Sequence, residues 1–251
     1  MTFDEVLSLG RLRECLATGT GKGVRIGILD SGVASDLPVL GGRVAANFEV
    51  VEDSYRGARV VPLTKGVDVI EHGTACAYII HRHAPDAELH SVRVIGRSHG
   101  STTGKLLAAL EFAVEQDWHL LNLSLGTEAS YERIARLADR AYYRGQIWVA
   151  AKDNKRQKVG YPAGLASVVG VDMEYFEDPA TFRYFPGRET EVEAGGVYVE
   201  APTSSGGWQQ FTGTSFACPQ VTGIAARLLE HFPDLTPFQL KTALAALREN
   251  R

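Results

Sequence analysis

The chain of 251 residues is 45% apolar and 22% charged, and its 26 basic and 30 acidic side chains give a net charge of −4. This length and composition predict one soluble globular domain over residues 1–251, large enough to bury a core without disulfides. The sequence has neither a Lys/Arg-rich block that would bind nucleic acid nor an apolar run that would cross a membrane.

The cysteines and the first residues bear on the cellular compartment. Cys15, Cys76 and Cys218 are sparse and odd in number, and no two have CxxC spacing. They predict free thiols in a reducing environment. The start of the chain lacks the basic segment and apolar core of a secretory signal, so we expect a cytoplasmic protein. The sequence leaves the oligomeric state open.

The first half of the chain alternates predicted strands and helices. An apolar run over residues 24–30 predicts a buried parallel strand, with Asp30 at its carboxyl end. Residues 33–66 are rich in Gly, Pro and mixed charge, and predict a long irregular segment. The periodicity then predicts a helix over 72–83, a strand over 89–95 and a helix over 103–117.

The second half continues this alternation. Predicted strands span 120–126, 146–151 and 167–172, and predicted helices span 131–145, 214–232 and 236–250. Strands that alternate with helices predict right-handed βαβ units, and therefore an α/β fold with a parallel sheet. In an open sheet of this kind, functional sites gather at the carboxyl ends of the strands.

Three short segments carry candidate chemistry: residues 30–32 (DSG), 72–74 (HGT) and 213–215 (GTS). Acyl transfer needs a hydroxyl nucleophile, an imidazole that accepts its proton, and an acid that orients the imidazole. The first segment ends a predicted strand and the other two begin predicted helices, where backbone N–H donors favour a developing anion. Taken singly, Asp30 is equally typical of a turn, and His72 and Ser215 of helix N-caps.

The longer segments around these residues remove much of that ambiguity. They read VRIGILDSGV, EHGTACAYI and FTGTSFACPQVTGIAARLL, and between them stand APDAELHSVRVIG, LLNLSLG, WVAAKDN, GYPA and VVGVD. In this order they resemble the subtilisin-like serine peptidases, or subtilases, along nearly the whole chain. The resemblance implies a three-layer fold, with helices on both faces of a mostly parallel twisted sheet. It also implies a serine endopeptidase that uses no cofactor. Only 29 residues precede Asp30, too few for the pro-region of secreted relatives, so we expect an intracellular enzyme that processes a specific peptide or protein substrate.

The resemblance assigns catalytic roles residue by residue. Ser215 is expected to be the nucleophile and His72 the general base, which then acts as acid. Asp30 is expected to orient His72 and to stabilise its charged form. Asn154 is expected to bind the oxyanion, together with the backbone N–H of Ser215.

The same resemblance assigns the substrate-binding residues. Ser124, Leu125 and Gly126 are expected to pair with the substrate backbone and to flank the first specificity pocket. Family members usually have small residues before the oxyanion Asn, whereas this chain has Lys152 and Asp153. As pocket walls, Asp153 would favour a basic substrate side chain and Lys152 an acidic one. Alternatively, both point to solvent and pair with neighbours.

The region after His72 bears on metal binding. Many family members carry a calcium-binding loop after the His motif, but residues 81–85 run directly from the predicted helix into Pro85. We therefore expect no calcium site there. His81, His83 and His90 suggest another metal, but a spacing of two residues on a helix directs the first two apart. We predict no metal.

Two cysteines lie close to the catalytic residues in the sequence. Cys76 follows His72 by one helical turn, and Cys218 follows Ser215 by three residues. The first resembles the thiol-containing branch of the family, similar to proteinase K and thermitase. We expect both thiols to pack as small apolar groups, and a mercurial to inhibit through Cys76.

The sequence leaves three functions open. An endopeptidase and a peptide ligase or cyclase share the same acyl-enzyme, so they differ only in whether water or an amine attacks it. A catalytically silent subtilase that serves as a binding module is the third alternative. The presence of Asp30, His72, Ser215 and Asn154 argues against it, and the Lys152-Asp153 departure is its only support.

Overall fold

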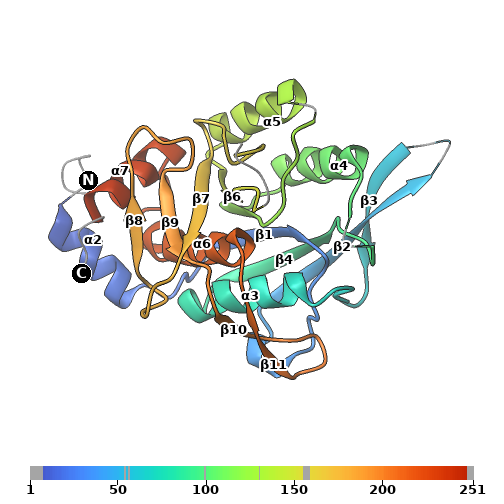
Figure 1. Ribbon diagram of the computed structural model, residues 1–251, viewed down its shortest axis with the longest axis horizontal. Helices are drawn as coiled ribbons and strands as arrows, with labels where there is room; N and C mark the ends of the chain where they lie inside the picture. The colour runs from blue at the N-terminus through green and yellow to red at the C-terminus, as the bar shows by residue number, and fades with distance from the viewer. Residues whose placement is uncertain are drawn as a thin grey trace.

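A computed structural model describes residues 8–53, 55, 57–98, 100–129, 131–154 and 159–247 (Figure 1). The helices are α2 (Leu9–Thr18), η1 (Pro38–Leu40, a 3-10 turn), α3 (His72–His83), α4 (Thr103–Val114), α5 (Tyr131–Tyr143), α6 (Thr214–His231) and α7 (Pro237–Leu247). The strands are β1 (Arg25–Asp30), β2 (Val44–Asp53), β3 (Gly57–Leu63), β4 (Glu88–Arg93), β5 (Leu120–Leu123), β6 (Ile147–Ala151), β7 (Val169–Glu174), β8 (Phe182–Tyr184), β9 (Val192–Gly195), β10 (Val199–Pro202) and β11 (Trp208–Phe211).

Nine of these strands form one twisted sheet in the order β3-β2-β4-β1-β5-β6-β7-β9-β8. The pairs from β2 to β9 are parallel, and only the outermost strands β3 and β8 run antiparallel to their neighbours. The sheet crosses the molecule from β8 to β3 in Figure 1. Strands β10 and β11 form a separate antiparallel ribbon.

Helices cover both faces of the sheet, and each face has its own apolar core. Successive strand residues point to opposite faces. Thus Ile28 of β1 packs in the core shared with α2, α3, α6 and α7, and the next residue, Leu29, packs in the core shared with α4 and α5. The protein therefore has the predicted α/β fold in three layers. No helix in the described part of the chain is both long and apolar enough to span a bilayer.

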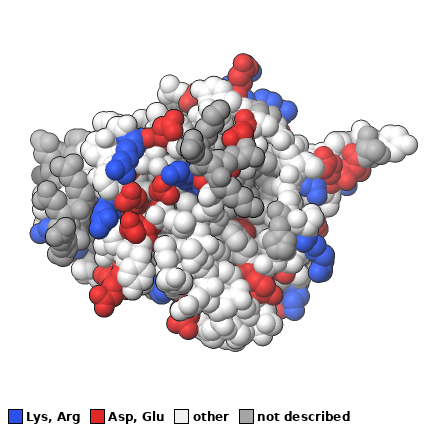
Figure 2. All heavy atoms as spheres, viewed as in Figure 1, with Lys and Arg blue, Asp and Glu red and all other residues white. Residues whose placement is uncertain are grey.

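The largest error in the sequence interpretation concerns residues 33–66. Instead of an irregular segment, β2 and β3 form a long hairpin that extends from the body of the molecule (Figure 1). Most of its residues are half-buried or exposed, so the apolar signal of a strand is weak. Pro62 lies in β3, which tolerates it as an edge strand. Both signs of charge are scattered over the face in Figure 2.

Other elements differ in smaller ways. Helix α2, strands β8 and β9 and the β10–β11 ribbon lie in segments to which no element was assigned. Strand β5 ends at Leu123 rather than at residue 126, so the chain from Ser124 onward is free to line a cleft. Helix α7 ends at Leu247 in the described chain, and residues 248–250 of the predicted helix lie outside the described residues.

Candidate active site

The carboxyl edge of the sheet brings the predicted site residues together. Asp30 ends β1, Ser124 follows β5 and Asn154 lies just beyond β6, while His72 and Ser215 begin α3 and α6. A cleft of about 490 Å³ opens at this edge. Its lining includes Ser124, Leu125, Gly126, Lys152, Asp153, Asn154 and Ser215.

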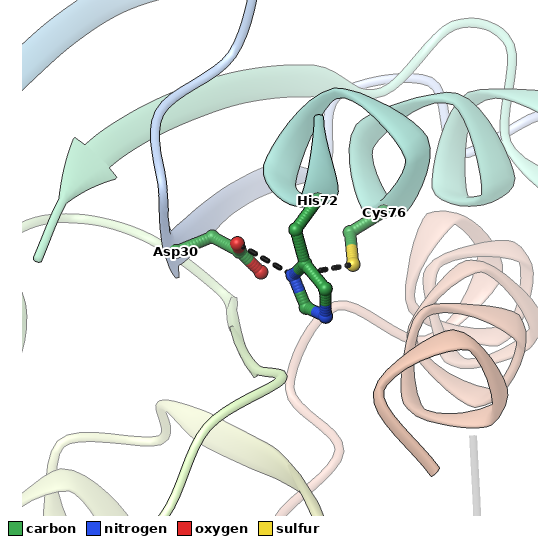
Figure 3. Close-up of side chains that lie close together, drawn as sticks. All are labelled: Asp30, His72 and Cys76. Carbon is green, nitrogen blue, oxygen red and sulfur yellow. Dashed lines mark hydrogen bonds and ion pairs between the residues drawn. The ribbon is translucent and has the colours of Figure 1, made fainter. Parts of the chain in front are cut away.

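Asp30 and His72 are in direct contact (Figure 3). The Nδ1 atom of His72 lies 2.7 Å from Oδ1 of Asp30, whose side chain is 1% exposed. The sequence allows this approach because Gly73 follows His72. A Cβ atom at position 73 would lie only 2.1 Å from the carbonyl oxygen of Gly32 and 3.1 Å from Cβ of Asp30. The HGT motif therefore fits a helix start pressed against the end of β1.

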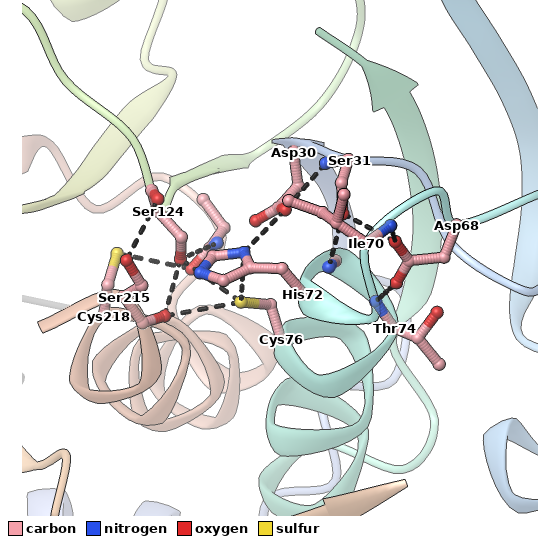
Figure 4. A network of polar contacts seen from close by, with 12 residues as sticks. Asp30, Ser31, Asp68, Ile70, His72, Thr74, Cys76, Ser124, Ser215 and Cys218 are labelled. Carbon is pink, nitrogen blue, oxygen red and sulfur yellow. Dashed lines mark hydrogen bonds and ion pairs between the residues drawn. The ribbon is translucent and has the colours of Figure 1, made fainter. Parts of the chain in front are cut away.

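The start of α3 is held by residues from other segments (Figure 4). Ser31 Oγ accepts a hydrogen bond from the backbone N–H of Gly73 and donates to Asp68. Asp68 also accepts from the N–H of Thr74 at 2.8 Å. The residue at the N-cap is Glu71, which makes no side-chain cap bond, so the N-cap interpretation of His72 is wrong. The helix is capped by Ser31 and Asp68 instead.

Ser215 is fixed through its backbone. Pro219 has no N–H to bond the carbonyl of Ser215 four residues earlier. That carbonyl accepts from Ser124 Oγ at 2.8 Å and from Cys76 Sγ at 3.4 Å. The N-cap of α6 is Gly213, so the N-cap interpretation of Ser215 is also wrong.

The hydroxyl of Ser215 is bonded to a backbone acceptor. It donates to the carbonyl oxygen of Ser124 at 3.2 Å, and within the described residues it makes no hydrogen bond to His72. Catalytic hydrogen bonds are often formed only when substrate binds. A substrate N–H that bonded to the Ser124 carbonyl would release the hydroxyl toward the imidazole.

Asn154 is exposed but oriented. Its Oδ1 accepts from the backbone N–H of Thr214 at 2.9 Å. The hydroxyl of Thr214 in turn donates to the carbonyl of Lys152 at 2.5 Å, which ties the segment after β6 to the start of α6. Because Oδ1 is engaged, the Nδ2 group of Asn154 is left as the donor beside Ser215 in the cleft.

The protonation of the site follows from its burial and charges. Burial acts to lower the pKa of His72, but the carboxylate of Asp30, with a smaller effect of Cys76, outweighs it and raises this pKa. Burial raises the pKa of Cys76 to about 11. The thiol is therefore protonated at neutral pH and is a poor nucleophile.

The same residues form a candidate metal cluster. Ligand atoms of Asp30, His72 and Cys76 lie within 4.8 Å of one another, and this is the one such group of three in the described residues. Oδ2 of Asp30 is buried without a hydrogen-bond partner among the described residues. A soft metal ion bound here would occupy the imidazole that acyl transfer requires.

Comparison with known proteins adds to this geometry. Residues 21–246 match the subtilase family (Peptidase_S8). The chain belongs to the subtilase family. It is 31% identical over 88% of its length to the thermostable alkaline protease of Halalkalibacterium halodurans, and it spans 61% of that protein. It is 29% identical over 92% of its length to subtilisin DY of Bacillus licheniformis, and it spans 85% of that protein.

Solved structures agree in fold. The chain superposes on Sphericase with a TM-score of 0.75 and 24% identity, covering 95% of this chain and 88% of that one. It superposes on a cold adapted subtilisin-like serine proteinase with a TM-score of 0.73 and 24% identity, covering 89% and 81%. The fold is therefore subtilisin-like.

The two charged residues before Asn154 have different surroundings in this subtilase. The Nζ of Lys152 lies 2.5 Å from Oδ2 of Asp172 on β7, so its charge is paired within the protein. The backbone N–H of Asp153 donates to the carbonyl of Val159 across the cleft wall. Both residues line the cleft beside Asn154.

The other predicted groups have separate structural roles. All three cysteines are free, as predicted, and Cys76 and Cys218 are buried, as predicted; Cys15 is buried as well. His83 lies 2.5 Å from Oε1 of Gln220, whereas His90 stacks on Trp118, so these two histidines do not converge.

The sequence interpretation missed Asp68 and Glu71, which act at the start of α3. Neither belongs to a spaced pattern, because both lie in the loop before the HGT motif. The available signal was two acids close before that motif, and acids in a polar loop are too common to single out.

Proposed function

We propose that this subtilase is a serine endopeptidase that cleaves peptide bonds through an acyl-enzyme at Ser215. The observation that carries this proposal is the 2.7 Å contact between His72 and the buried Asp30, beside a cleft that contains Ser215 and Asn154. A buried carboxylate holds one imidazole tautomer and stabilises the imidazolium that forms when the base accepts a proton. Family membership supports the same chemistry.

The proposed reaction proceeds in two halves. Ser215 Oγ attacks the substrate carbonyl carbon as its proton passes to Nε2 of His72, and the carbonyl oxygen becomes an oxyanion. Asn154 Nδ2 and the N–H of Ser215 stabilise that charge. The C–N bond then breaks, the proton on His72 passes to the leaving amine, and an ester remains on Ser215. In the second half, water attacks the ester carbonyl as His72 accepts its proton. The bond to Ser215 Oγ then breaks, His72 returns the proton to Oγ, and the acid is released.

Acyl transfer to an amine is the second candidate, and one observation favours it. The ring of Phe216 lies 5.0 Å from the imidazole of His72, and Phe211 packs behind it at 4.8 Å. An apolar surface beside the base disfavours water relative to an amine with an apolar side chain. Product masses separate the two outcomes, since hydrolysis adds one water and ligation or cyclisation adds none.

A fluorophosphonate probe tests the shared chemistry. We expect a covalent adduct on Ser215 that is lost in Ser215→Ala and in His72→Ala. Ser101→Ala, which changes another serine of the same cleft, is the matched control and should label normally. A folded wild-type protein without an adduct would contradict the proposal and favour a binding module.

A further inference from the structure

The β10–β11 ribbon packs directly on the helix that carries His72. Val199 and Ala201 of β10 share a small apolar core with Ala75, Cys76 and Ile79 of α3, together with Phe216 of α6. This core is separate from the two that flank the sheet. The ring of Trp208 on β11 also meets Tyr78 edge-on at 5.1 Å. The ribbon therefore follows α3 along its first two turns.

The tip of the ribbon is bonded to the residue before His72. Glu71 accepts a hydrogen bond from the backbone N–H of Ser204 and a second from its hydroxyl at 2.7 Å. Ser204 follows β10 by two residues, and the two partners are 133 positions apart in the chain. Both are only partly exposed. The contact is a two-bond clasp to a carboxylate, which is stronger than a neutral pair.

Glu71 also has a backbone conformation that needs support. Its φ of 68° lies in the left-handed region, which a residue with a side chain occupies only when its surroundings impose it. His72 is thus flanked by a residue in a disfavoured conformation on one side and by Gly73, which has no side chain to anchor it, on the other. Ser31 and Asp68 hold the backbone after His72, and the contact at Glu71 is the support on the side before it.

The base of the ribbon reaches the imidazole by a second route. Phe211, the last residue of β11, packs against Phe216, whose ring contacts the imidazole of His72. Phe216 is 6% exposed, so it cannot move aside without disturbing this core. The ribbon consequently contacts His72 from its backbone side through Glu71 and from its ring side through Phe216.

We propose that the β10–β11 ribbon is a brace for His72, and that Glu71 is the positioning residue through which the ribbon tip sets the imidazole against Ser215. This inference rests on the proposed function, since it assigns His72 the role of base. Asp30 fixes Nδ1 of the ring, and the ribbon fixes the backbone from which the ring extends. In this proposal neither Glu71 nor Ser204 contacts the substrate.

Variants of the clasp test this proposal. Glu71→Ala removes both bonds, Glu71→Gln keeps one acceptor oxygen, and Ser204→Ala keeps the backbone donor. A displacement of about 1 Å at a reacting group lowers the rate on the order of 100-fold, so we expect kcat of Glu71→Ala to fall about tenfold to hundredfold, with KM little changed. The other two variants should lose less. Ser205→Ala changes a hydroxyl of the ribbon tip that contacts Thr203 rather than Glu71, and should match wild type.

Glu71→Gly separates positioning from stability. Glycine relieves the left-handed conformation but removes the clasp, so we expect a thermal midpoint at or above that of Glu71→Ala with the same low kcat. Recovery of kcat in Glu71→Gly would overturn the proposal, because backbone strain rather than the clasp would then explain the loss. A kcat of Glu71→Ala within twofold of wild type would also overturn it.

A spectroscopic measurement keeps this test distinct from that of the proposed function. The proton between His72 and Asp30 should give a low-field ¹H resonance that is sharp in wild type and broadened or shifted in Glu71→Ala, whether or not the protein cleaves peptides. An unchanged resonance with unchanged kcat refutes the brace. A missing fluorophosphonate adduct in wild type refutes the peptidase and leaves the resonance to decide on the brace.

Discussion

The two sides of the candidate site, called here the closed wall and the open wall, are built differently. On one wall, Asp30 is fully buried, and the helix start that carries His72 is capped by Ser31 and Asp68 from separate segments. On the other wall, Asn154 is exposed and is anchored by a single bond from the backbone of Thr214. The first wall is a closed network of buried side chains, and the second is a more exposed segment held mainly through backbone hydrogen bonds.

This difference separates chemistry from specificity. Buried polar groups tolerate little change, because each depends on partners that cannot be replaced by water. The first wall accordingly keeps the sequence pattern of the family. The departures from that pattern, Lys152 and Asp153, both lie on the open wall, where a new side chain meets solvent or substrate. The closed wall should therefore set the rate and the open wall the choice of substrate.

Asp30→Asn should give the largest effect. An amide at this position would no longer hold the imidazole in the tautomer that accepts a proton from Ser215, and such a loss lowers kcat about 10⁴-fold. Since the carboxylate of Asp30 raises the pKa of His72, its removal lowers that pKa. The rising limb of kcat/KM against pH, which follows deprotonation of His72, should move to lower pH.

The control for this change lies on the open wall. Asp172→Asn removes the carboxylate that pairs with Lys152. The two side chains are 26% and 27% exposed, respectively, and surface ion pairs of this kind contribute about 0–1 kcal/mol to the free energy of unfolding. Its pH profile should match wild type. A limb for Asp30→Asn that stays in place or moves to higher pH would contradict the assignment of Asp30 as partner of the base.

Asn154→Ala should follow in size. Loss of one oxyanion donor from a serine peptidase lowers kcat about 10²–10³-fold, with little change in KM, because the donor acts mainly in the transition state. Asn154→Asp is the informative partner variant. It keeps the oxygen that accepts from Thr214 but replaces the donor by an anion, so its kcat should fall at least as far. Equal activity of Asn154→Asp and wild type would rule out the donor role.

Burial explains how much of the fold the sequence revealed. Strands β1 and β6 are buried on both faces and give continuous apolar runs, and they were predicted close to their observed bounds. Strand β11 has an exposed surface and the hairpin strand β3 is only half-buried, so neither carries a comparable signal. The β10–β11 ribbon packs on one small core only, so its sequence has too few apolar positions to predict a strand.

The candidate site divides in the same manner. His72 and Ser215 stand in motifs that also contain a glycine or a proline with a structural role in the backbone. Gly73 allows the close approach of α3 to β1, and Pro219 leaves the carbonyl of Ser215 without its helical donor. The clasp at Glu71 joins positions 133 apart, and no local pattern encodes such a pair. Side-chain direction was equally hidden, as the pairing of Lys152 with a partner on β7 shows.

His83 links the helix that carries His72 to the stability of the whole protein. It lies at the far end of α3, where burial lowers its pKa from 6.5 to about 4, with Arg82 and Arg227 adding to that effect against Gln220 and Asp178. Between about pH 4 and 6.5, His83 is therefore protonated in the unfolded chain but neutral in the folded protein. Stability is full above pH 6.5 and is lost as the pH falls toward 4, by about 3 kcal/mol for this shift.

Urea unfolding at pH 7.5 and pH 4.5 measures this dependence. His83→Gln lacks the titrating group and should lose less stability between the two pH values, even if it is less stable at both. Equal losses in wild type and variant would show that protonation of His83 is not what destabilises the protein in acid.

The smallest expected effect concerns substrate choice on the open wall. Asp153→Asn keeps the shape of the side chain and removes its charge. We expect kcat/KM for substrates with Arg or Lys before the cleaved bond to fall about tenfold relative to kcat/KM for substrates with Leu there, which corresponds to about 1.4 kcal/mol. Lys152→Gln is the matched control: its amine is already held by Asp172, so the ratio should stay unchanged. If Lys152→Gln shifts the ratio and Asp153→Asn does not, the open wall selects acidic side chains through a lysine that leaves Asp172 when substrate binds.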